Sequence, residues 1–207
     1  MHLILLPVLE TTRLLLRPIE LTDAEAVFEY AASPLVGPNA GWKPHQTIEE
    51  AKQFINYCIK KRDFGQPGNY AVVLKETNTM IGTCEIHSYK DHKGEIGFVL
   101  HPGYWNKGIM TEAAKAVIVY GFEVLKLKRL AYGHFVFNDR SKRVCEKLGF
   151  TFEGILRKKY MSYDGTALDE AIYSIIDDDY LNGKIPWLED FRTNTLKDSS
   201  VDYKAIK

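Results

Sequence analysis

The sharpest chemical signal in the sequence is a turn at Lys107-Gly108 that leads directly into a predicted long helix. Backbone N–H groups at the N-terminus of a helix are unpaired, and the helix dipole there favours an anion. Gly108 lets a ligand approach the backbone closely, so the turn is suited to hold a phosphate or a pyrophosphate. A tight turn ahead of a core helix would use the same glycine. The turn lacks the GxxxxGK[ST] pattern and gives little support for ATP binding.

Groups that could move protons stand on the two segments before this turn. Glu95 opens the nearer segment, whereas Glu85 and His87 lie on the segment before it. A carboxylate or a neutral imidazole can take a proton from an attacking nucleophile. Glu85 and His87 share one face of a predicted strand, where a solvated surface would explain them equally well. The residues alone leave both interpretations open.

A second polar group surrounds the predicted helix 139–148, which Gly149 closes. Asn138 and Ser141 stand at its start, where both could cap the helix or contact a ligand. Four basic side chains follow along this helix, at Arg140, Lys142, Arg143 and Lys147. They could bind phosphate groups or form a solvated face. The run 157–159 is basic too, but alternation along a strand divides it between two faces.

The elements that must position these groups follow from hydrophobic periodicity and from turn residues. Strands are predicted at 13–19, 69–75, 80–89, 94–101, 129–136, 150–163 and 168–176, the second to fourth of them as an antiparallel meander. Helices are predicted at 22–32, 47–62, 108–126 and 139–148, and the loop 33–46 is predicted to be irregular and mobile. Capping boxes start the first two helices, with Thr22 paired to Glu25 and Thr47 paired to Glu50.

Composition limits the class of protein. The chain has 207 residues, of which 45% are hydrophobic, so it can bury a core without disulfides and is not disordered overall. Its 27 basic and 27 acidic residues balance, which argues against a nucleic-acid partner. Three scattered cysteines predict no disulfide framework, no zinc site and a reducing, cytoplasmic compartment. The apolar start 1–9 lacks a basic region and predicts no signal peptide, and no segment has the roughly 20 apolar residues of a membrane helix.

The run Gly97–Ala113, together with Asn138–Ser141 and Glu146–Phe150, resembles the GNAT family of acetyl-CoA-dependent N-acetyltransferases, and within it the RimJ/RimL branch. Two motifs in the right order carry this resemblance, which covers the chain from about residue 11 to 176. It implies an α/β (α+β) fold with a mixed, mostly antiparallel sheet of six to seven strands, splayed in a V at its central strands and flanked by about four helices. We expect one GNAT domain at 1–178 and an extension at 179–207 that is partly docked or disordered.

The resemblance implies that the turn holds the pyrophosphate of acetyl-CoA, the cosubstrate. The family's loop pattern Q/R-x-x-G-x-G/A falls on 105–110, where Gly108 matches. Trp105 and Met110 depart from that pattern in a way that resembles the RimJ/RimL branch, so CoA binding remains the expectation. The backbone N–H groups implied to hold the pyrophosphate are those of Asn106, Lys107, Gly108, Ile109, Met110 and Thr111.

Further CoA contacts are implied on either side of the loop. A strand backbone is implied to pair with the pantetheine arm as an added β-strand, at Phe98, Val99 and Leu100. Side chains of the second motif are implied to lie beside pantetheine, its sulfur and the phosphorylated ribose, namely Asn138, Ser141, Arg140 and Arg143.

Acetyl transfer to an amine requires a base for the nitrogen, a donor for the oxyanion and a proton for the leaving thiolate. Glu95 is the first candidate for the base and Glu85 the second, with His87 a further alternative. The resemblance implies the backbone N–H of Val99 or Leu100 as the oxyanion donor.

The general acid is where the sequence departs from the family. A tyrosine often stands seven residues after the motif asparagine, and this chain has Cys145 there, for which packing is the favoured role. Ser141 and Tyr160 are the remaining hydroxyls, and Ser141 is preferred.

The sequence therefore predicts an enzyme that moves an acetyl group from acetyl-CoA to a primary amine by direct attack in a ternary complex. A protein or peptide N-terminus is the favoured acceptor, which makes a ribosomal protein a candidate partner. The alternatives are a small amine, such as a polyamine, an amino acid or an antibiotic, and an acetyl-CoA sensor without turnover. We expect a monomer or a homodimer without membrane attachment.

Overall fold

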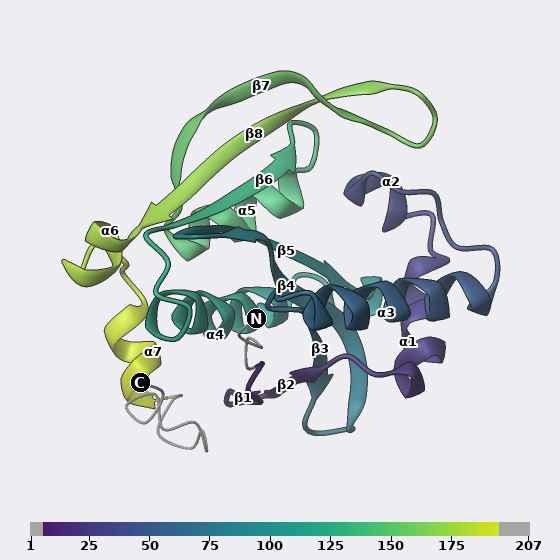
Figure 1. Ribbon diagram of the computed structural model, residues 1–207, viewed down its shortest axis with the longest axis horizontal. Coiled ribbons are helices and arrows are strands. Elements are labelled where there is room, and N and C mark those ends of the chain that lie inside the picture. The colour runs from purple at the N-terminus through teal and green to yellow at the C-terminus, as the bar shows by residue number, and fades with distance from the viewer. Residues whose placement is uncertain (1–5, 195–207) are drawn as a thin grey trace.

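The computed structural model describes residues 6–194, and its centre is an eight-stranded sheet in the order β1-β2-β3-β4-β5-β6-β8-β7 (Figure 1). The strands are β1 (Leu9–Glu10), β2 (Leu14–Pro18), β3 (Asn69–Leu74), β4 (Thr79–Lys90), β5 (Lys93–Leu100), β6 (Arg129–Phe135), β7 (Thr151–Met161) and β8 (Ala167–Ile176). All neighbours are antiparallel except β5 and β6. The predicted mixed sheet is confirmed, and it has eight strands rather than six or seven because the short β1 pairs with β2.

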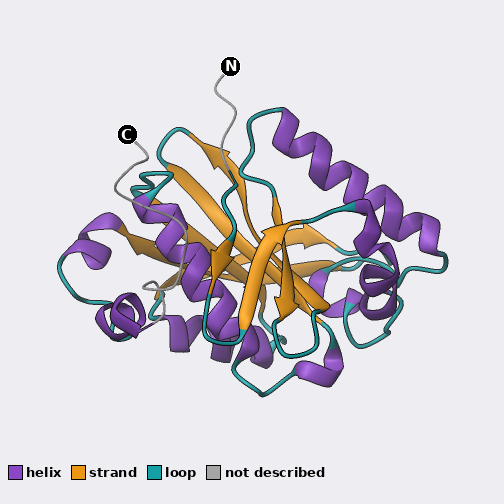
Figure 2. Ribbon diagram, turned by 90° about the horizontal axis from the view of Figure 1, so that it is seen from below, coloured by secondary structure: helices purple, strands orange, loops and turns teal. Residues whose placement is uncertain are grey.

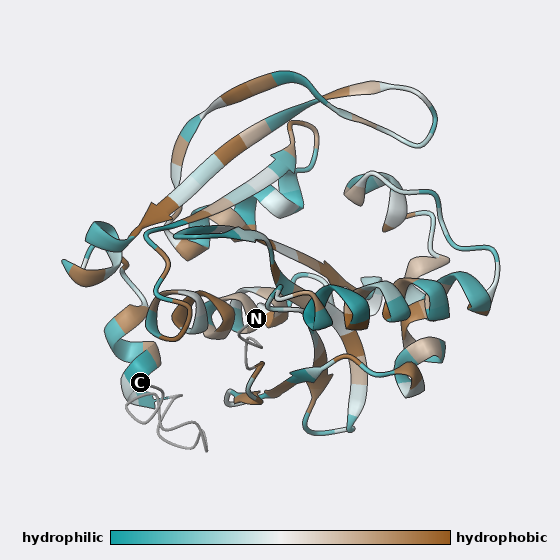
Figure 3. Cartoon of the chain, viewed as in Figure 1, coloured by the Kyte–Doolittle hydropathy of each residue, from teal (hydrophilic) through white to brown (hydrophobic). Residues whose placement is uncertain are grey.

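Helices cover both faces of this sheet (Figure 2). One face carries α4 (Ile109–Glu123) and α5 (Asp139–Leu148), and the other carries α1 (Ala24–Ala31) and α3 (Ile48–Asp63). Most of α3 is hydrophilic, as its colour in Figure 3 shows, and it buries a narrow stripe at Ala51, Ile55 and Cys58. The stripe points at the sheet and the hydrophilic side points outward, as expected for an amphipathic surface helix.

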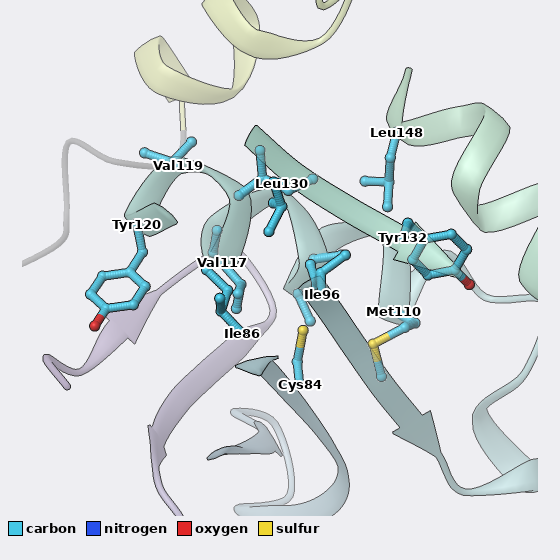
Figure 4. Packing of buried hydrophobic residues seen from close by; sticks show 14 of the residues in the cluster. Cys84, Ile86, Ile96, Met110, Val117, Val119, Tyr120, Leu130, Tyr132 and Leu148 are labelled. Carbon is cyan, nitrogen blue, oxygen red and sulfur yellow. The ribbon is translucent and has the colours of Figure 1, made fainter. Parts of the chain in front are cut away.

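The core between α4 and the central strands fixes where that helix begins. Ile86 from β4, Ile96 from β5 and Leu130 from β6 are buried and lie around Val117 of α4 (Figure 4). Each such side chain contributes about 1.5–3 kcal/mol when fully removed from water. This packing holds the N-terminus of α4 beyond the end of β5, where the turn predicted to bind an anion lies.

The central strands separate as the sequence predicted. β5 and β6 pair only from Lys93 to Glu95 and from Arg129 to Ala131, although β5 continues to Leu100 and β6 to Phe135. The backbone N–H and C=O groups of β5 that face β6 beyond this point therefore have no partner strand. The V-shaped opening is confirmed, and it begins directly after Glu95.

The predicted cap of the first helix is wrong. A 3-10 turn (Leu21–Asp23) precedes α1, and the reciprocal cap joins Glu20 to Asp23 rather than Thr22 to Glu25. The Asp23 carboxylate accepts the Glu20 N–H at 2.9 Å and binds Arg17 at 2.6 Å. Asp23 is buried by this ion pair, and that burial sets the position at which the helix starts.

The predicted irregular loop 33–46 contains a short helix, α2 (Gly37–Ala40). The second capping box is confirmed, because the Glu50 carboxylate accepts the Thr47 N–H at 3.2 Å at the start of α3.

Two further helices, α6 (Asp177–Leu181) and α7 (Leu188–Asn194), follow the last strand. The Trp187 indole N–H donates to the Leu148 carbonyl at 2.9 Å, and Arg192 pairs with Glu123 at 2.6 Å, so this segment contacts α5 and α4. Residues 195–207, on which part of the predicted disorder falls, lie outside the described residues. Among residues 6–194 no helix combines the length and the apolar character needed to span a membrane.

Asp23→Ala is expected to lower the free energy of unfolding by about 2–3 kcal/mol, because it leaves Arg17 without its buried partner and the Glu20 N–H without an acceptor. Thr22→Ala is the matched control and is expected to change it by less than about 0.5 kcal/mol, since Thr22 is exposed. Urea denaturation measures both. Equal effects would contradict the corrected cap.

Candidate active site

The opening between β5 and β6 leads into a cavity of about 670 Å³ that reaches both motifs. The predicted site residues that line it are Glu85, Glu95, Phe98, Val99, Leu100, Trp105, Asn106, Gly108, Ile109, Met110, Thr111, Asn138, Arg140, Ser141, Arg143 and Tyr160. Lys107 is the exception. Its side chain donates back to the Gly103 carbonyl at 2.9 Å.

The turn before α4 presents free N–H groups to the cavity. Gly108 caps the helix with a φ of 71°, and Asn106 also has a positive φ of 60°. The first intrahelical bond runs from the Glu112 N–H to the Gly108 carbonyl at 3.1 Å. The N–H groups of residues 109–111 precede it and have no intrahelical acceptor. This end of the cavity can hold an anion without any further side chain.

Glu112 holds that turn in place from the first turn of α4. Its carboxylate accepts from the Thr11 hydroxyl at 2.6 Å and from the Arg13 backbone N–H at 2.9 Å. The Arg13 guanidinium binds the same carboxylate at 2.6 Å and donates to the Lys107 carbonyl at 3.0 Å. The sequence analysis missed this clamp because its members lie about a hundred residues apart.

The backbone direction of β5 decides which N–H groups face the opening. The His101 N–H donates to the Ile81 carbonyl on the β4 side at 2.8 Å, and Val99 lies opposite Thr83. Because bonding direction alternates along a strand, the Val99 N–H faces β4 and the Leu100 N–H faces the opening. The Leu100 carbonyl receives the Trp105 indole N–H at 2.8 Å. Of the two predicted oxyanion donors, only Leu100 points into the cavity.

The start of α5 forms the opposite wall. The Asn138 side-chain oxygen accepts the Ser141 N–H at 3.2 Å, and its amide group donates to the Asn39 carbonyl at 3.1 Å. The buried Tyr132 hydroxyl donates to Ser141 Oγ at 2.8 Å, which leaves the Ser141 O–H free to donate elsewhere. Asn138 therefore joins this wall to the loop that contains α2.

Cys145 is fully buried and does not line the cavity. Burial raises the pKa of its thiol. Both facts favour the packing role over proton transfer.

Arg140 and Tyr160 are held by the cavity wall. The Arg140 guanidinium lies 4.2 Å from the centre of the Trp105 ring, a cation–π arrangement that joins the two motifs. The Tyr160 hydroxyl donates to the Gly41 carbonyl at 3.3 Å, so the β7–β8 hairpin contacts the α2 loop. Tyr160 is consequently committed to this contact.

The acidic groups of the sequence prediction lie on the face of the sheet away from α4. His87 is opposite Glu95 and Glu85 is opposite Gly97, so all of these side chains share one face. Lys61 of α3 pairs with Glu85 at 3.1 Å, whereas His87 Nε2 is 4.0 Å from a Glu95 oxygen. Glu85 is therefore neutralised by a neighbouring cation, and Glu95 has no lysine or arginine ion pair among the described residues.

Among the acidic and basic residues that line the cavity, the sequence did not indicate His134, Lys159 and Glu170. They come from β6, β7 and β8, and only the pairing of β8 with both other strands brings them together. Burial, and then the charge of Glu95, raise the pKa of Glu170. Hydrophobic periodicity predicts these strands correctly, but it does not indicate that polar residues from the three strands line one cavity with Glu95.

Residues 13–151 match the family described as Acetyltransferase (GNAT) domain. The chain is 34% identical over 172 residues to the uncharacterized N-acetyltransferase YoaA of Bacillus subtilis, covering 82% of this chain and 97% of that protein. A Bacillus anthracis acetyltransferase of the GNAT family has a similar structure, with a TM-score of 0.74, 33% identity and coverage of 83% and 99% of the two chains.

Two further solved structures share the fold. The ribosomal-protein-S5-alanine acetyltransferase of Vibrio fischeri is 26% identical with a TM-score of 0.71, covering 84% of this chain and 98% of that chain. Mycobacterium smegmatis RimJ in complex with CoA-disulfide is 18% identical with a TM-score of 0.72, covering 84% and 87%, and shares the fold.

Asn138→Ala is expected to lower the free energy of unfolding by about 1–2 kcal/mol, because it removes the cap of α5. It should also speed amide hydrogen exchange in residues 36–42, since the Asn39 carbonyl loses its donor. Asn138→Asp keeps an oxygen for the cap and loses only the amide donor.

The aspartate variant should therefore recover most of the stability while the loop continues to exchange quickly. If exchange in the α2 loop were slow in both variants, Asn138 would not be what holds the loop.

Proposed function

The chain belongs to the GNAT acetyltransferase family, and from this premise we propose that it transfers an acetyl group from acetyl-CoA to the N-terminal amine of a protein or peptide. Transfer proceeds by direct attack within a ternary complex. The observation that carries this proposal is a single cavity whose one end offers free N–H groups and whose other end offers Glu95.

The residues at the anion-binding end fit the CoA part of acetyl-CoA. The N–H groups of 109–111 and the left-handed Gly108 suit a pyrophosphate, which needs close backbone approach. The unpaired edge of β5 beyond Glu95 suits the amides of the pantetheine arm, which can pair as an added strand. Arg140 and Arg143 line the same cavity and supply positive charge for the phosphates.

Acetyl-CoA supplies the activated acetyl group, and the protein supplies three functions around it. Glu95 accepts a proton from the amine, directly or through a water molecule. The Leu100 N–H donates to the oxygen that gains negative charge when the amine attacks. Ser141 has a free O–H because its oxygen already accepts from Tyr132, and it donates to the leaving sulfur.

A peptide N-terminus is favoured as the acceptor by the similarity to the Vibrio fischeri enzyme, whose name specifies an alanine of ribosomal protein S5. A ribosomal protein is accordingly a candidate substrate, and a cytoplasmic location is part of the proposal. Trp42 and Tyr160 line the acceptor side, and the α2 loop and the β7–β8 hairpin form its walls. In a bound peptide, the residues that follow the N-terminal amine would leave the cavity between these walls.

The acceptor is tested by incubating the full chain with acetyl-CoA and reading acetylated products by mass spectrometry. Peptides that begin with Ser or Ala are expected to be acetylated at the N-terminus. N-terminally blocked lysine peptides, polyamines and aminoglycosides, which carry other amines, are not. Turnover confined to a small amine would overturn the peptide proposal, and tight acetyl-CoA binding without any turnover would favour a sensor.

Glu95→Gln is expected to lower kcat/KM for the acceptor roughly 10²–10³-fold, since it removes the proton acceptor while preserving shape. The dissociation constant of CoA, measured by calorimetry, should stay unchanged. Glu189→Gln makes the same charge change on the exposed surface of α7 and serves as the control. Full activity of Glu95→Gln would remove Glu95 from the mechanism.

Gly108→Ala is expected to weaken CoA binding roughly 5–20-fold, because a side chain at a φ of 71° costs about 1–2 kcal/mol and the turn relaxes away from that geometry. Gly165→Ala imposes the same conformation at the tip of the β7–β8 hairpin, where φ is 84°. It should destabilise the fold similarly without changing CoA affinity. Equal CoA affinities in both variants would contradict the assignment of the turn.

A further inference from the structure

Glu170 of β8 lies beside Glu95 in the cavity, although it is not part of either motif. A Cβ atom built on Gly133 of β6 would lie 2.2 Å from Glu170 Oε1 and 3.2 Å from Glu95 Oε1. Both carboxylates therefore converge on the space that this glycine leaves open. Glu95 is the last paired residue of β5, and Gly133 lies two residues beyond the last paired residue of β6, so both stand where the V-shaped opening begins.

Lys159 offsets the charge of this pair only in part. Glu95 faces Glu170 from β5, and Lys159 faces it from β7, with Nζ 3.7 Å from Glu170 Oε2. The Lys159 side chain is half exposed, so water weakens its interaction with Glu170. His134 of β6 points to the opposite face of the sheet, and His87 faces Glu95 from β4.

His134 lines the same cavity from the opposite face of the sheet, because it alternates with Gly133 along β6. Its Nδ1 lies 2.9 Å from the Phe135 carbonyl and must donate to it, because a carbonyl oxygen only accepts. Its Nε2 is buried and has no hydrogen-bond partner among residues 6–194. A buried ring nitrogen without a partner on the wall of a cavity is a place for a donor that enters from outside.

We propose that Glu170 and Glu95 act as a carboxylate pair that binds the acceptor as its ammonium ion and takes one proton from it. The proposal rests on the proposed function and assigns to Glu170 a part in it. An ammonium group carries a positive charge and N–H donors, so it suits two carboxylates side by side. A neutral or anionic acceptor group does not.

The proton balance of this step is complete without another reactant. The bound ammonium gives one proton to the pair, and the freed lone pair forms the N–C bond to the acetyl carbonyl. The C–S bond breaks, the second proton lost from nitrogen goes to the sulfur, and the pair returns its proton to solvent. The products are an amide and free CoA thiol.

Burial and the charge of Glu95, in this order, raise the pKa of Glu170. A raised carboxyl pKa brings the pair closer to the pH at which it can both take up and release a proton. Glu85 is instead paired with Lys61 of α3, whose Nζ lies 3.1 Å from its carboxylate. The pair is thus Glu95 with Glu170 and not Glu95 with Glu85.

The first test is independent of activity. Carboxyl ¹³C NMR of the full chain reports the titration of Glu170 in the wild type and in Glu95→Gln. Removal of the Glu95 charge is expected to lower the pKa of Glu170, whereas Glu189→Gln should leave it unchanged. An unchanged Glu170 titration in Glu95→Gln would overturn the pair.

The second test uses kinetics with an acetylated peptide identified in the panel above. Glu170→Gln is expected to lower kcat/KM for the peptide roughly tenfold or more and to move the acid limb of its pH profile by about one unit to lower pH. The acid limb reports the titration of the two carboxylates together. When only one of them is left, no like charge stands beside it, and the limb moves to lower pH. Glu170→Asp should restore part of the activity, and the CoA dissociation constant should not change.

Gly133→Ala provides a second variant that leaves both carboxylates in the chain. Its methyl group meets the far end of the Glu170 side chain, which can swing away at small cost in stability. It is expected to reproduce the activity loss of Glu170→Gln. Wild-type kinetics and pH profile in Glu170→Gln would overturn the proposal, whereas absence of peptide acetylation by the wild type would overturn the proposed function and leave the NMR result to decide the pair.

Discussion

The separation of β5 from β6 is the constraint on which the rest of the structure depends. The two strands share three residue pairs and then diverge, so that the second half of β5 keeps unpaired backbone groups on one side. Buried backbone groups must find partners, and a sheet that leaves a strand edge open inside the protein provides a place for a ligand with amides of its own. The packing of α4 against β4, β5 and β6 keeps the opening from closing by holding the strands at fixed positions.

Both ends of the cavity are stabilised by interactions that lie outside it. Glu112 joins the start of α4 to residues 11–13, and through Arg13 it reaches the Lys107 carbonyl. Asn138 joins the start of α5 to the α2 loop. In each case a side chain in the cap or first turn of a helix also bonds a distant segment. The N–H groups of the turn before α4 and the α2 loop are therefore ordered before any ligand binds.

Three carboxylates on one face of the sheet have different surroundings, and the roles proposed for them rest on this difference. Lys61 neutralises Glu85, Glu95 stands at the point where the opening begins, and Glu170 is partly buried beside Glu95 with a raised pKa. Burial and like charge both disfavour the ionised form, so the environment rather than the residue type makes one glutamate basic enough to take part in proton transfer. The same reasoning sets aside Cys145, because burial keeps its thiol protonated and away from the cavity.

The sequence alone determined the order of the elements and the turn at Gly108, because periodicity, helix caps and glycine geometry are local and leave a local pattern. The family and the splayed sheet followed from the resemblance of two motifs to the GNAT family. The sequence misplaced the cap of α1, because the ion pair that buries Asp23 involves Arg17 on another element. It left Val99 and Leu100 as equal candidates, and only the register of β4 with β5 showed that the Leu100 N–H faces the opening. The tertiary structure alone decided that Glu170 and His134 belong to the site, since β8 returns to pair with β6 from a position far along the chain. The tertiary structure decides which charged side chains come close across strands and how burial changes their pKa values. No local sequence pattern indicates either.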